Sequence, residues 1–413
     1  MAERVLTFAE ALQTVLAQAR VVPAPGEYES VPLQDATGRV LAAAVRAERD
    51  QPPFDRATRD GFALRAADVG EELKVLGSVR AGEAWPGSVL EPGEAVEIMT
   101  GAPMPAGADA VVMVEHTALA NGLLKVEAGR TLHAGENVVP RGAEARKGDS
   151  LLPVGRVLGA AEIAVAASCG CAQLPVFARP KLAIVATGDE LVELGSADLS
   201  AAQIYNSNSH ALAALARAEG GFAGRLPIAR DNRHDLRERI AQGSMWDLLV
   251  LSGGVSMGRF DLVEEVLAEF GAEFFFTGAL IQPGKPIVFG RLPKQGSQPG
   301  EWTYFFGLPG NPVSTQVCFH LFVAPLLRAL AGRTEIAPVF VEARLAESVK
   351  GGAKVTRFLP AELTSAWDSV TVRVVGWQGS GDVTANACGN CYCVLPAGVE
   401  AFAKGETVRV LMR

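Results

Sequence analysis

The sequence carries no excess of basic residues. Its 413 residues include 38 Lys and Arg against 46 Asp and Glu, which gives a formal net charge of −8 and an isoelectric point near 5.4. General affinity for nucleic acid or for an anionic membrane requires a basic surface, so the composition argues against both kinds of partner. A small anionic ligand stays compatible with this charge if a metal ion or a local group of basic residues offsets the repulsion.

The sequence also has no long uninterrupted apolar run. A transmembrane helix needs about 18 such residues, and the longest candidate, residues 313–330, is interrupted by His320, Pro325 and Arg328. The N-terminal stretch contains acidic residues and too short an apolar run for a signal peptide. We therefore expect a cytoplasmic protein without a membrane-spanning segment.

Cysteine is scarce, with six residues in all. Three of them, Cys388, Cys391 and Cys393, form a C-x-x-C-x-C pattern that is compatible with a metal or redox site. No histidine lies nearby, however, and the alternation of residues 391–395 is typical of a half-buried strand. We favour a structural role for these cysteines.

Glycine and proline are abundant, with 44 and 24 residues, but they are not gathered into one low-complexity tract. Their recurrence indicates tight turns between short elements. A chain of this length exceeds one hydrophobic core, so several domains are expected. Changes in pattern predict four of them: an N-terminal linker domain at 1–49 and 141–177, an inserted β-rich domain at 50–140, an α/β domain at 178–331 and a C-terminal β-barrel at 332–413.

The part of the chain before residue 178 combines one clear helix with short strands. Residues 7–19 have the spacing of an amphipathic helix, with a capping box between Thr7 and Glu10. Punctuation by Gly and Pro predicts strands at 72–79, 94–99 and 110–115. Two unusual loops of the inserted domain, for which a plain surface loop is the simplest interpretation, lie at 54–63 and 98–105.

The α/β domain alternates between buried strands and helices. Strands are expected at 181–187, 225–229, 247–251, 273–276 and 304–306. Helices are expected at 209–219, 234–242 and 261–270, with a long helix at the end of the domain. This alternation predicts a doubly wound parallel sheet. The last domain has the short alternating strands of a small barrel, at 339–345, 369–375, 391–395 and 407–411.

Three glycine-containing turns follow strands of the α/β domain, at 187–190, 252–256 and 307–312. Ligands of open parallel sheets bind at the carboxyl ends of the strands, so all three turns should face one pocket. Glycines let the backbone approach closely, and the exposed N–H groups suit an oxyanion. We therefore predict that these turns hold a phosphorylated ligand, with contacts from Gly188, Asp189, Ser252, Gly253, Gly254, Ser256 and Gly310.

Carboxylates accompany these turns. Glu190 lies beside Asp189 at a strand end, Asp231 lies in the next turn, and Asp261 comes five residues after Ser256. Carboxylates beside a phosphate repel it unless a cation intervenes, and Mg²⁺ bridges such groups naturally. The pattern predicts a Mg²⁺ site among these four acids. Each acid taken alone also suits a solvated surface charge, and Asp261 also suits a helix cap.

Several motifs follow one another along nearly the whole chain: FDRATRDGFA, IMTGAPMPAGADAVVMVE, ATGDEL, SGGVSMG, QPGKP and GLPGNPVS. Together they resemble the MoeA and gephyrin-E family of molybdopterin molybdenumtransferases. The resemblance implies an elongated linker domain, an inserted β-domain, an α/β domain similar to molybdopterin adenylyltransferases, and a C-terminal barrel. It also implies a homodimer whose sites are completed by the partner's inserted domain.

The reaction implied by the resemblance is Mg²⁺-dependent insertion of molybdate into adenylylated molybdopterin, with release of AMP. Molybdopterin adenylyltransferase and recipient molybdoenzymes would be further partners. Asp60 and Thr100 would position the pterin or molybdate from the partner subunit. The resemblance also selects Glu190, Asp231 and Asp261 as the acids that would organise metal and pyrophosphate. Other family positions that bind the cofactor correspond to Lys285, Pro309, Pro312, Arg357 and Ser380.

The sequence departs from the family pattern at four positions. Gln282 and Gly278 stand where the family often has lysines, Glu144 stands for an aspartate, and Arg59 replaces a small residue or methionine. Two functions therefore stay open. One is an active molybdenum-insertion enzyme. The other is a carrier or scaffold that binds a pterin nucleotide or a partner protein. A stand-alone adenylyltransferase is disfavoured because the α/β domain is embedded among three others.

Overall fold

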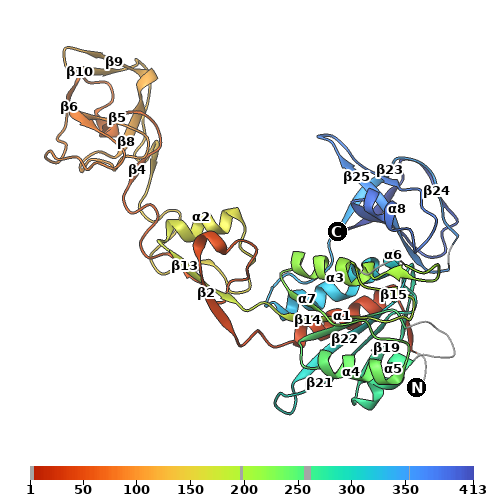
Figure 1. The fold of residues 1–413 in the computed structure, drawn as a ribbon. Coiled ribbons are helices and arrows are strands. Elements are labelled where there is room, and N and C mark those ends of the chain that lie inside the picture. Colours follow the sequence, from red (N-terminus) through yellow and green to blue (C-terminus); the bar gives the residue numbers. More distant parts are fainter. Residues whose placement is uncertain (1–3, 196–198, 255–261, 353) are drawn as a thin grey trace.

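The computed structural model describes residues 4–195, 199–254, 262–352 and 354–413. The chain is extended rather than round (Figure 1). A small β-rich domain lies at one end, the α/β domain and the C-terminal barrel lie together at the other, and a thin layer of short strands and one helix connects them. The domain boundaries given above stay a prediction.

The inserted domain is built on one six-stranded sheet with the order β8-β5-β7-β6-β10-β9. Apolar residues are buried on both faces of this sheet, in two separate clusters. The three predicted strands are present, although the third ends early because residues 114–116 form a 3-10 turn. The strands are β5 (Gly61–Leu64), β6 (Leu73–Val79), β7 (Glu94–Ile98), β8 (Ala110–Met113), β9 (Thr117–Ala120) and β10 (Leu123–Val126).

Pairs of antiparallel strands connect the inserted domain to the rest of the chain. At the point of entry, the N–H of Gln51 donates to the carbonyl of Ala145, and the guanidinium of Arg141 donates to Asp50 at 2.7 Å. Both chain segments therefore run side by side into the inserted domain. The elements of this layer are β2 (Tyr28–Pro32), β3 (Val45–Arg46), β4 (Arg56–Ala57), β11 (Val138–Val139), β12 (Ser150–Leu152), α2 (Ala160–Ser168) and β13 (Gln173–Phe177).

The α/β domain has a six-stranded sheet with the order β17-β14-β18-β22-β21-β19. The first four strands are parallel, as predicted, but the last two are antiparallel to their neighbours. The strand predicted at 225–229 is instead Phe222–Arg225, because Pro227 has no N–H to continue the ladder. The other strands are β14 (Lys181–Ala186), β18 (Leu248–Ser252), β19 (Glu273–Phe276), β21 (Val288–Pro293) and β22 (Trp302–Leu308).

Helices cover both faces of this sheet (Figure 1). The helices are α3 (Ser207–Ala218), α4 (Arg233–Gly243), α5 (Leu262–Glu269), α6 (Pro312–Cys318) and α7 (Ala324–Leu330). A π-helical segment, Phe319–Val323, joins the last two into one run. That run is apolar and long enough to cross a membrane, but 78% of it is buried inside the protein. It is a core helix, as predicted for the end of this domain, and His320, Pro325 and Arg328 lie within it.

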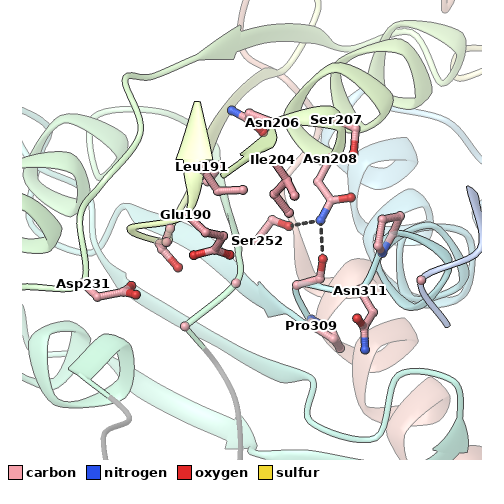
Figure 2. Close-up of a pocket in the computed structure, with 18 of the residues that line it drawn as sticks. Glu190, Leu191, Ile204, Asn206, Ser207, Asn208, Asp231, Ser252, Pro309 and Asn311 are labelled. Atoms are coloured by element: carbon pink, nitrogen blue, oxygen red, sulfur yellow. Dashed lines mark hydrogen bonds between the residues drawn. The ribbon is translucent and has the colours of Figure 1, made fainter. Parts of the chain in front are cut away.

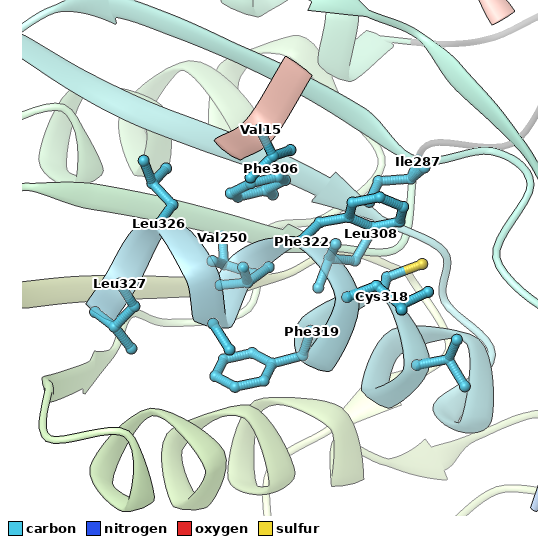
Figure 3. Packing of buried hydrophobic residues seen from close by; sticks show 14 of the residues in the cluster. Val15, Val250, Ile287, Phe306, Leu308, Cys318, Phe319, Phe322, Leu326 and Leu327 are labelled. Carbon is cyan, nitrogen blue, oxygen red and sulfur yellow. The ribbon is translucent and has the colours of Figure 1, made fainter. Parts of the chain in front are cut away.

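The core packs the N-terminal helix against this run. Helix α1 (Phe8–Val21) begins at the predicted capping box, where Thr7 and Glu10 bond reciprocally. Its buried residues Ala11, Val15 and Ala19 join a cluster with strands β18 and β22. Figure 3 shows Val15 above Phe306, with aromatic rings from the apolar run beside them. Helix α1 therefore stabilises the α/β domain, although it precedes the linker layer in sequence.

The C-terminal domain contains a closed barrel. Five strands pair in a ring, β25-β26-β23-β29-β27 and back to β25. Two segments from elsewhere extend this sheet, since β1 (Val5–Thr7) pairs with β20 (Gly278–Gln282), which pairs with β25. The elements are β23 (Phe340–Leu345), β24 (Val349–Lys350), β25 (Thr356–Ser365), β26 (Val370–Val374), α8 (Val383–Cys388), β27 (Cys391–Leu395), β28 (Ala401–Phe402) and β29 (Thr407–Met412).

Strand β27 is fully buried, not half-buried as its alternation predicted. One face, with Cys391 and Cys393, lies in the barrel core, while Tyr392 and Val394 pack into the core of the α/β domain. Burial raises the pKa of Cys391 to about 11 and that of Cys393 to about 12, so both stay thiols at neutral pH. All six cysteines of the described chain are free.

Candidate functional site

A pocket of about 1020 Å³ opens at the carboxyl ends of β14, β18 and β22 (Figure 2). The three glycine-containing turns meet there. Of the predicted ligand-binding residues, the pocket is lined by Gly188, Ser252, Gly253, Gly254, Pro309, Gly310 and Pro312. The prediction that the turns share one edge of the sheet is therefore confirmed, although Asp189 does not line the pocket.

The turns approach one another so closely that two positions require glycine. Gly253 and Gly254 have φ angles of 95° and 67°, which favour glycine. A Cβ on Gly253 would also lie 2.5 Å from the carbonyl oxygen of Thr187, and one on Gly254 would lie 2.7 Å from the Thr187 hydroxyl. The first two turns are therefore in direct contact.

An asparagine joins the second and third turns. The Asn208 side-chain nitrogen lies 3.0 Å from the Ser252 hydroxyl and 2.7 Å from the Gly310 carbonyl oxygen, as the dashed lines in Figure 2 show. Asn208 belongs to the first turn of α3. The sequence predicted that this helix begins at residue 209, two residues after its observed start. Our sequence reasoning missed this residue because a neutral amide in a helix carries no motif or charge signal.

A second asparagine fixes the start of that helix. Asn206 is 2% exposed, and its side-chain oxygen caps α3 by accepting the N–H of Ser209 at 3.2 Å. Its amide nitrogen donates to Glu193 at 2.9 Å, and Glu193 also accepts a bond from Arg225. These hydrogen bonds fix the first turn of α3, and Asn208, whose side chain contacts the second and third turns, belongs to it.

Two of the predicted metal-binding carboxylates face the same pocket, those of Glu190 and Asp231. Partial burial raises the pKa of Asp231, and the negative charges of Asp189 and Glu190 raise it further. Asp189 itself turns away, since its carboxylate accepts the N–H of Asp231 at 3.3 Å. Glu190 and Asp231 therefore concentrate negative charge at one wall of the pocket.

The third predicted metal ligand, Asp261, lies outside the described residues, as does Ser256. Within the described ranges, no group of three His, Cys, Asp or Glu side chains is arranged to hold a metal ion. Two carboxylates with open coordination still suit Mg²⁺, which usually keeps several waters and takes one or two carboxylates together with phosphate oxygens. Glu190 and Asp231 fit that requirement.

The barrel contributes a further wall of the pocket through Gly381 and Val383. Ser380 does not line the pocket, but its carbonyl accepts the N–H of Val313 at 3.0 Å and so ties the barrel to α6. The Asn386 amide donates to Gln316 at 3.0 Å and forms a second tie. The candidate site thus depends on two domains of the same chain.

The predicted basic residues do not line the pocket. Lys285 is exposed and precedes Pro286, which does line the pocket. Arg357 lies in β25, with one guanidinium nitrogen donating to the carbonyl of Lys350 at 3.1 Å. Among the described residues that line the pocket, none is Lys or Arg. The charge of the described lining is therefore negative.

Asp60 and Thr100 are close to each other but belong to the inserted domain. The Asp60 carboxylate accepts the N–H of Thr100 at 2.6 Å, and hydrogen bonds from Thr100 lower the pKa of Asp60. Figure 1 places this domain at the far end of the chain from the α/β domain. A single chain therefore does not bring Asp60 and Thr100 to the pocket.

Comparisons with known proteins cover the whole chain. Three family models match it: the MoeA N-terminal region (domain I and II) at residues 6–170, a probable molybdopterin binding domain at 183–329, and the MoeA C-terminal region (domain IV) at 342–412. A protein of a Nostoc species named molybdopterin molybdenumtransferase is 36% identical, covering 93% of this chain and 88% of its own. A protein of the same name from Staphylococcus aureus is 33% identical, covering 98% and 94%.

Solved structures agree with these matches. A molybdopterin biosynthesis MoeA protein from Pyrococcus horikosii superposes with a TM-score of 0.74 at 34% identity, covering 99% of both chains. Another MoeA structure, from Pyrococcus horikoshii, gives a TM-score of 0.80 at 28% identity, covering 99% of this chain and all of the other. The architecture expected from the sequence motifs is thereby confirmed.

Proposed function

Because this chain belongs to the MoeA family of molybdopterin molybdenumtransferases, we propose that it inserts molybdate into adenylylated molybdopterin and releases AMP. The observation that carries the proposal is the meeting of three glycine-containing turns in one pocket, beside two carboxylates. Backbone N–H groups of such turns suit phosphate oxygens, and the carboxylates suit the cation that accompanies them.

The size of the pocket supports a large ligand. Small-molecule sites usually measure about 300–1,000 Å³, and this pocket, at about 1020 Å³, lies at the upper end of that range. A pterin joined to a nucleotide through pyrophosphate is a ligand of that class. Its pyrophosphate would lie on the glycine turns, with Gly188, Ser252 and Gly310 as contacts.

Mg²⁺ would be held by Glu190 and Asp231, with Asp261 as the third candidate. When bound, the ion would neutralise charge on the pyrophosphate and on the leaving AMP. The lining of the pocket by both Glu190 and Asp231 supports this assignment; burial raises the pKa of Asp231, and the charges of Asp189 and Glu190 raise it further. Glu190 and Asp231 would hold the ion beside the glycine-containing turns that receive the phosphate oxygens.

The basic and barrel residues would receive the oxyanion substrate. Lys285 and Arg357 lie at the junction where β20 joins β25 of the barrel, since the Lys285 carbonyl accepts the N–H of Ala279 and Arg357 pairs with Gln282. Ser380 lies beside α6, where its carbonyl accepts the N–H of Val313. Their positions support a role in attracting molybdate beside the pterin, with Pro309 and Pro312 shaping the adjoining turn. The reaction uses small cytoplasmic substrates, and we propose that location for the protein.

The distance of the inserted domain from the pocket supports a homodimer. Asp60 and Thr100 would reach the site only from a second copy of the chain. Because the inserted domain lies away from the other domains, the inserted domain of each copy could contact the pocket of the other. In this arrangement each two-fold dimer has two sites, and each site uses the α/β domain and barrel of one chain with the inserted domain of the other.

Release of AMP from adenylylated molybdopterin, measured with and without molybdate, tests the proposal. We expect release to require Mg²⁺ and to be stimulated by molybdate. The pair Gln282 and Gly278, at positions where the resemblance leads us to expect lysines, is the observation that favours the alternative, a carrier that binds the pterin nucleotide without inserting metal. Tight nucleotide binding with no molybdate-dependent AMP release would establish that alternative.

A further inference from the structure

Two buried hydroxyl groups at the floor of the pocket can each donate a further hydrogen bond. Ser252 is 2% exposed and Thr187 is 3% exposed, and both line the pocket. They end neighbouring strands, where the N–H of Thr187 donates to the carbonyl of Ser252 at 2.9 Å. The Thr187 hydroxyl has no hydrogen-bond partner within the described part of the chain. Buried polar groups are rarely left without a hydrogen-bond partner, so this hydroxyl is well suited to bind a ligand.

The contacts of Asn208 determine the direction of the Ser252 hydrogen bond. A carbonyl oxygen only accepts, so the Asn208 atom at 2.7 Å from Gly310 must be the amide nitrogen. The same nitrogen lies 3.0 Å from the Ser252 hydroxyl oxygen, which must therefore accept. Because this N–H occupies a lone pair of the serine oxygen, the serine O–H is left to donate elsewhere.

We infer that Asn208 is a positioning residue that turns Ser252 into a dedicated hydrogen-bond donor for an oxyanion of the ligand, with Thr187 as the second donor. The inference rests on the proposed function and specifies how the floor of that site works. Glycines 253 and 254 keep the approach to both hydroxyls free of side chains.

The oxyanion has two possible sources, a phosphoryl oxygen of the pterin nucleotide or molybdate. Both present oxygen acceptors that need donors, so the chemistry of the floor is the same for either. Inorganic pyrophosphate and molybdate, each titrated into the full-length protein at fixed Mg²⁺ by calorimetry, distinguish them. Neither titration depends on turnover, so a failure of the insertion reaction would not obscure the result.

Removing the serine donor should weaken binding directly. Ser252→Ala loses a hydrogen bond to a charged acceptor, which corresponds to a roughly 10- to 100-fold weaker affinity for the oxyanion that occupies the floor. The matched control is Ser244→Ala, since Ser244 is also fully buried but its hydroxyl donates to the carbonyl of Ala241, far from the pocket lining. That variant should bind both oxyanions as the wild type does.

Coupling between Asn208 and Ser252 tests the positioning role. Asn208→Ala should weaken binding about tenfold, and the double variant should bind almost as well as Ser252→Ala alone, because the amide acts through the serine. Asn208→Asp keeps the shape but cannot donate, so it should weaken binding more than alanine does. If the losses of affinity in the two single variants multiply in the double variant, or if Asn208→Asp binds the oxyanion as well as the wild type does, Asn208 has only a structural role and the inference is wrong.

Thr187→Val separates binding from stability. The valine has nearly the same shape and removes a hydroxyl that has no hydrogen-bond partner among the described residues, so the thermal midpoint should not fall. Affinity for the oxyanion should nevertheless fall roughly tenfold. Unchanged affinity for both pyrophosphate and molybdate in Ser252→Ala and Thr187→Val would overturn the inference, even if the protein releases AMP normally.

Discussion

Gln282 lies directly opposite Arg357 in the parallel pairing of β20 with β25. A lysine at position 282 would therefore stand beside an existing guanidinium at the junction of the two domains. Gln282→Lys should lower the molybdate concentration for half-maximal AMP release by about tenfold, because a charged hydrogen bond to an anion contributes about 1.5–3 kcal/mol. Titration of molybdate in the AMP-release assay measures this change.

The second position that departs from the family behaves differently. A Cβ on Gly278 would lie 3.0 Å from a methyl group of Val5, so a side chain there meets β1 rather than the pocket. Gly278→Lys should lower the thermal midpoint without improving molybdate affinity. Equal gains from both lysine variants would show that the oxyanion lies on the β1 side, contrary to our proposal.

Neutralising a pocket carboxylate should remove metal dependence. Glu190→Gln keeps the shape of the side chain and deletes its charge, so Mg²⁺-dependent AMP release should fall roughly 30- to 1000-fold at limiting Mg²⁺. Glu238→Gln is the control, since Glu238 lies on the exposed surface of α4 and pairs with Arg239. Equal activity of the two variants at limiting Mg²⁺ would remove Glu190 from the metal site.

Asp231 should make stability depend on pH and on the metal. A raised pKa means that the folded protein binds the proton more tightly than the unfolded chain does, so the contribution of Asp231 to stability declines as pH rises above its ordinary value of 3.8. Asp231→Asn should therefore raise the thermal midpoint at neutral pH without Mg²⁺, and the gain should vanish when Mg²⁺ is added. Asp368→Asn, at an exposed turn, should show neither effect.

His320 should produce an opposite pH dependence. Burial, with a smaller effect of the Arg413 charge, lowers the pKa of His320 to about 4. The unfolded chain then binds more protons between about pH 6.5 and 4, so folding loses stability as pH falls through this window, by an amount on the order of 3 kcal/mol. In denaturant titrations His320→Gln should lose less stability over the window, whereas exposed His234→Gln should follow the wild type.

The proposed dimer makes a prediction about mixtures. Asp60→Ala and Glu190→Gln should each be inactive, but co-expressed chains should recover roughly a quarter of wild-type activity, because half of the dimers are mixed and each has one intact site. Mixtures of Asp231→Asn with Glu190→Gln, whose changes lie in the same pocket, are the control and should recover nothing. An inactive first mixture would mean that Asp60 does not act across a dimer.

The sequence predicted the parts of the site that follow from the order of the strands and from the glycines and carboxylates at the strand ends. Three turns with glycine after apolar strands could be placed on one edge because parallel strands end together, and Glu190 and Asp231 followed from their positions beside those turns. Asn208 and Thr187 escaped prediction because their roles depend on distances between segments far apart in sequence. Asp60 and Thr100 could be paired only through the family motifs, since no local pattern joins two loops 40 residues apart.

The fold, like the site, was predicted only in part from the sequence. Alternation identified the parallel core of the α/β sheet, whereas β20 was missed because its pairing partners, β1 and β25, come from distant parts of the chain. Strand β27 appeared half-buried by its pattern, and it is buried on both faces because a second domain packs against Tyr392. Local periodicity describes one element, and contacts between domains decide which of its faces meet water.

The pairing of β1 with β20 has a consequence for synthesis on the ribosome. Val5 is synthesised long before its partner Gly278, which lies far downstream in the chain. Until that partner is made, β1 cannot join its sheet, and closing so long a loop is slow. Docking of β1 and α1 on the α/β domain is therefore expected to be a late step of folding.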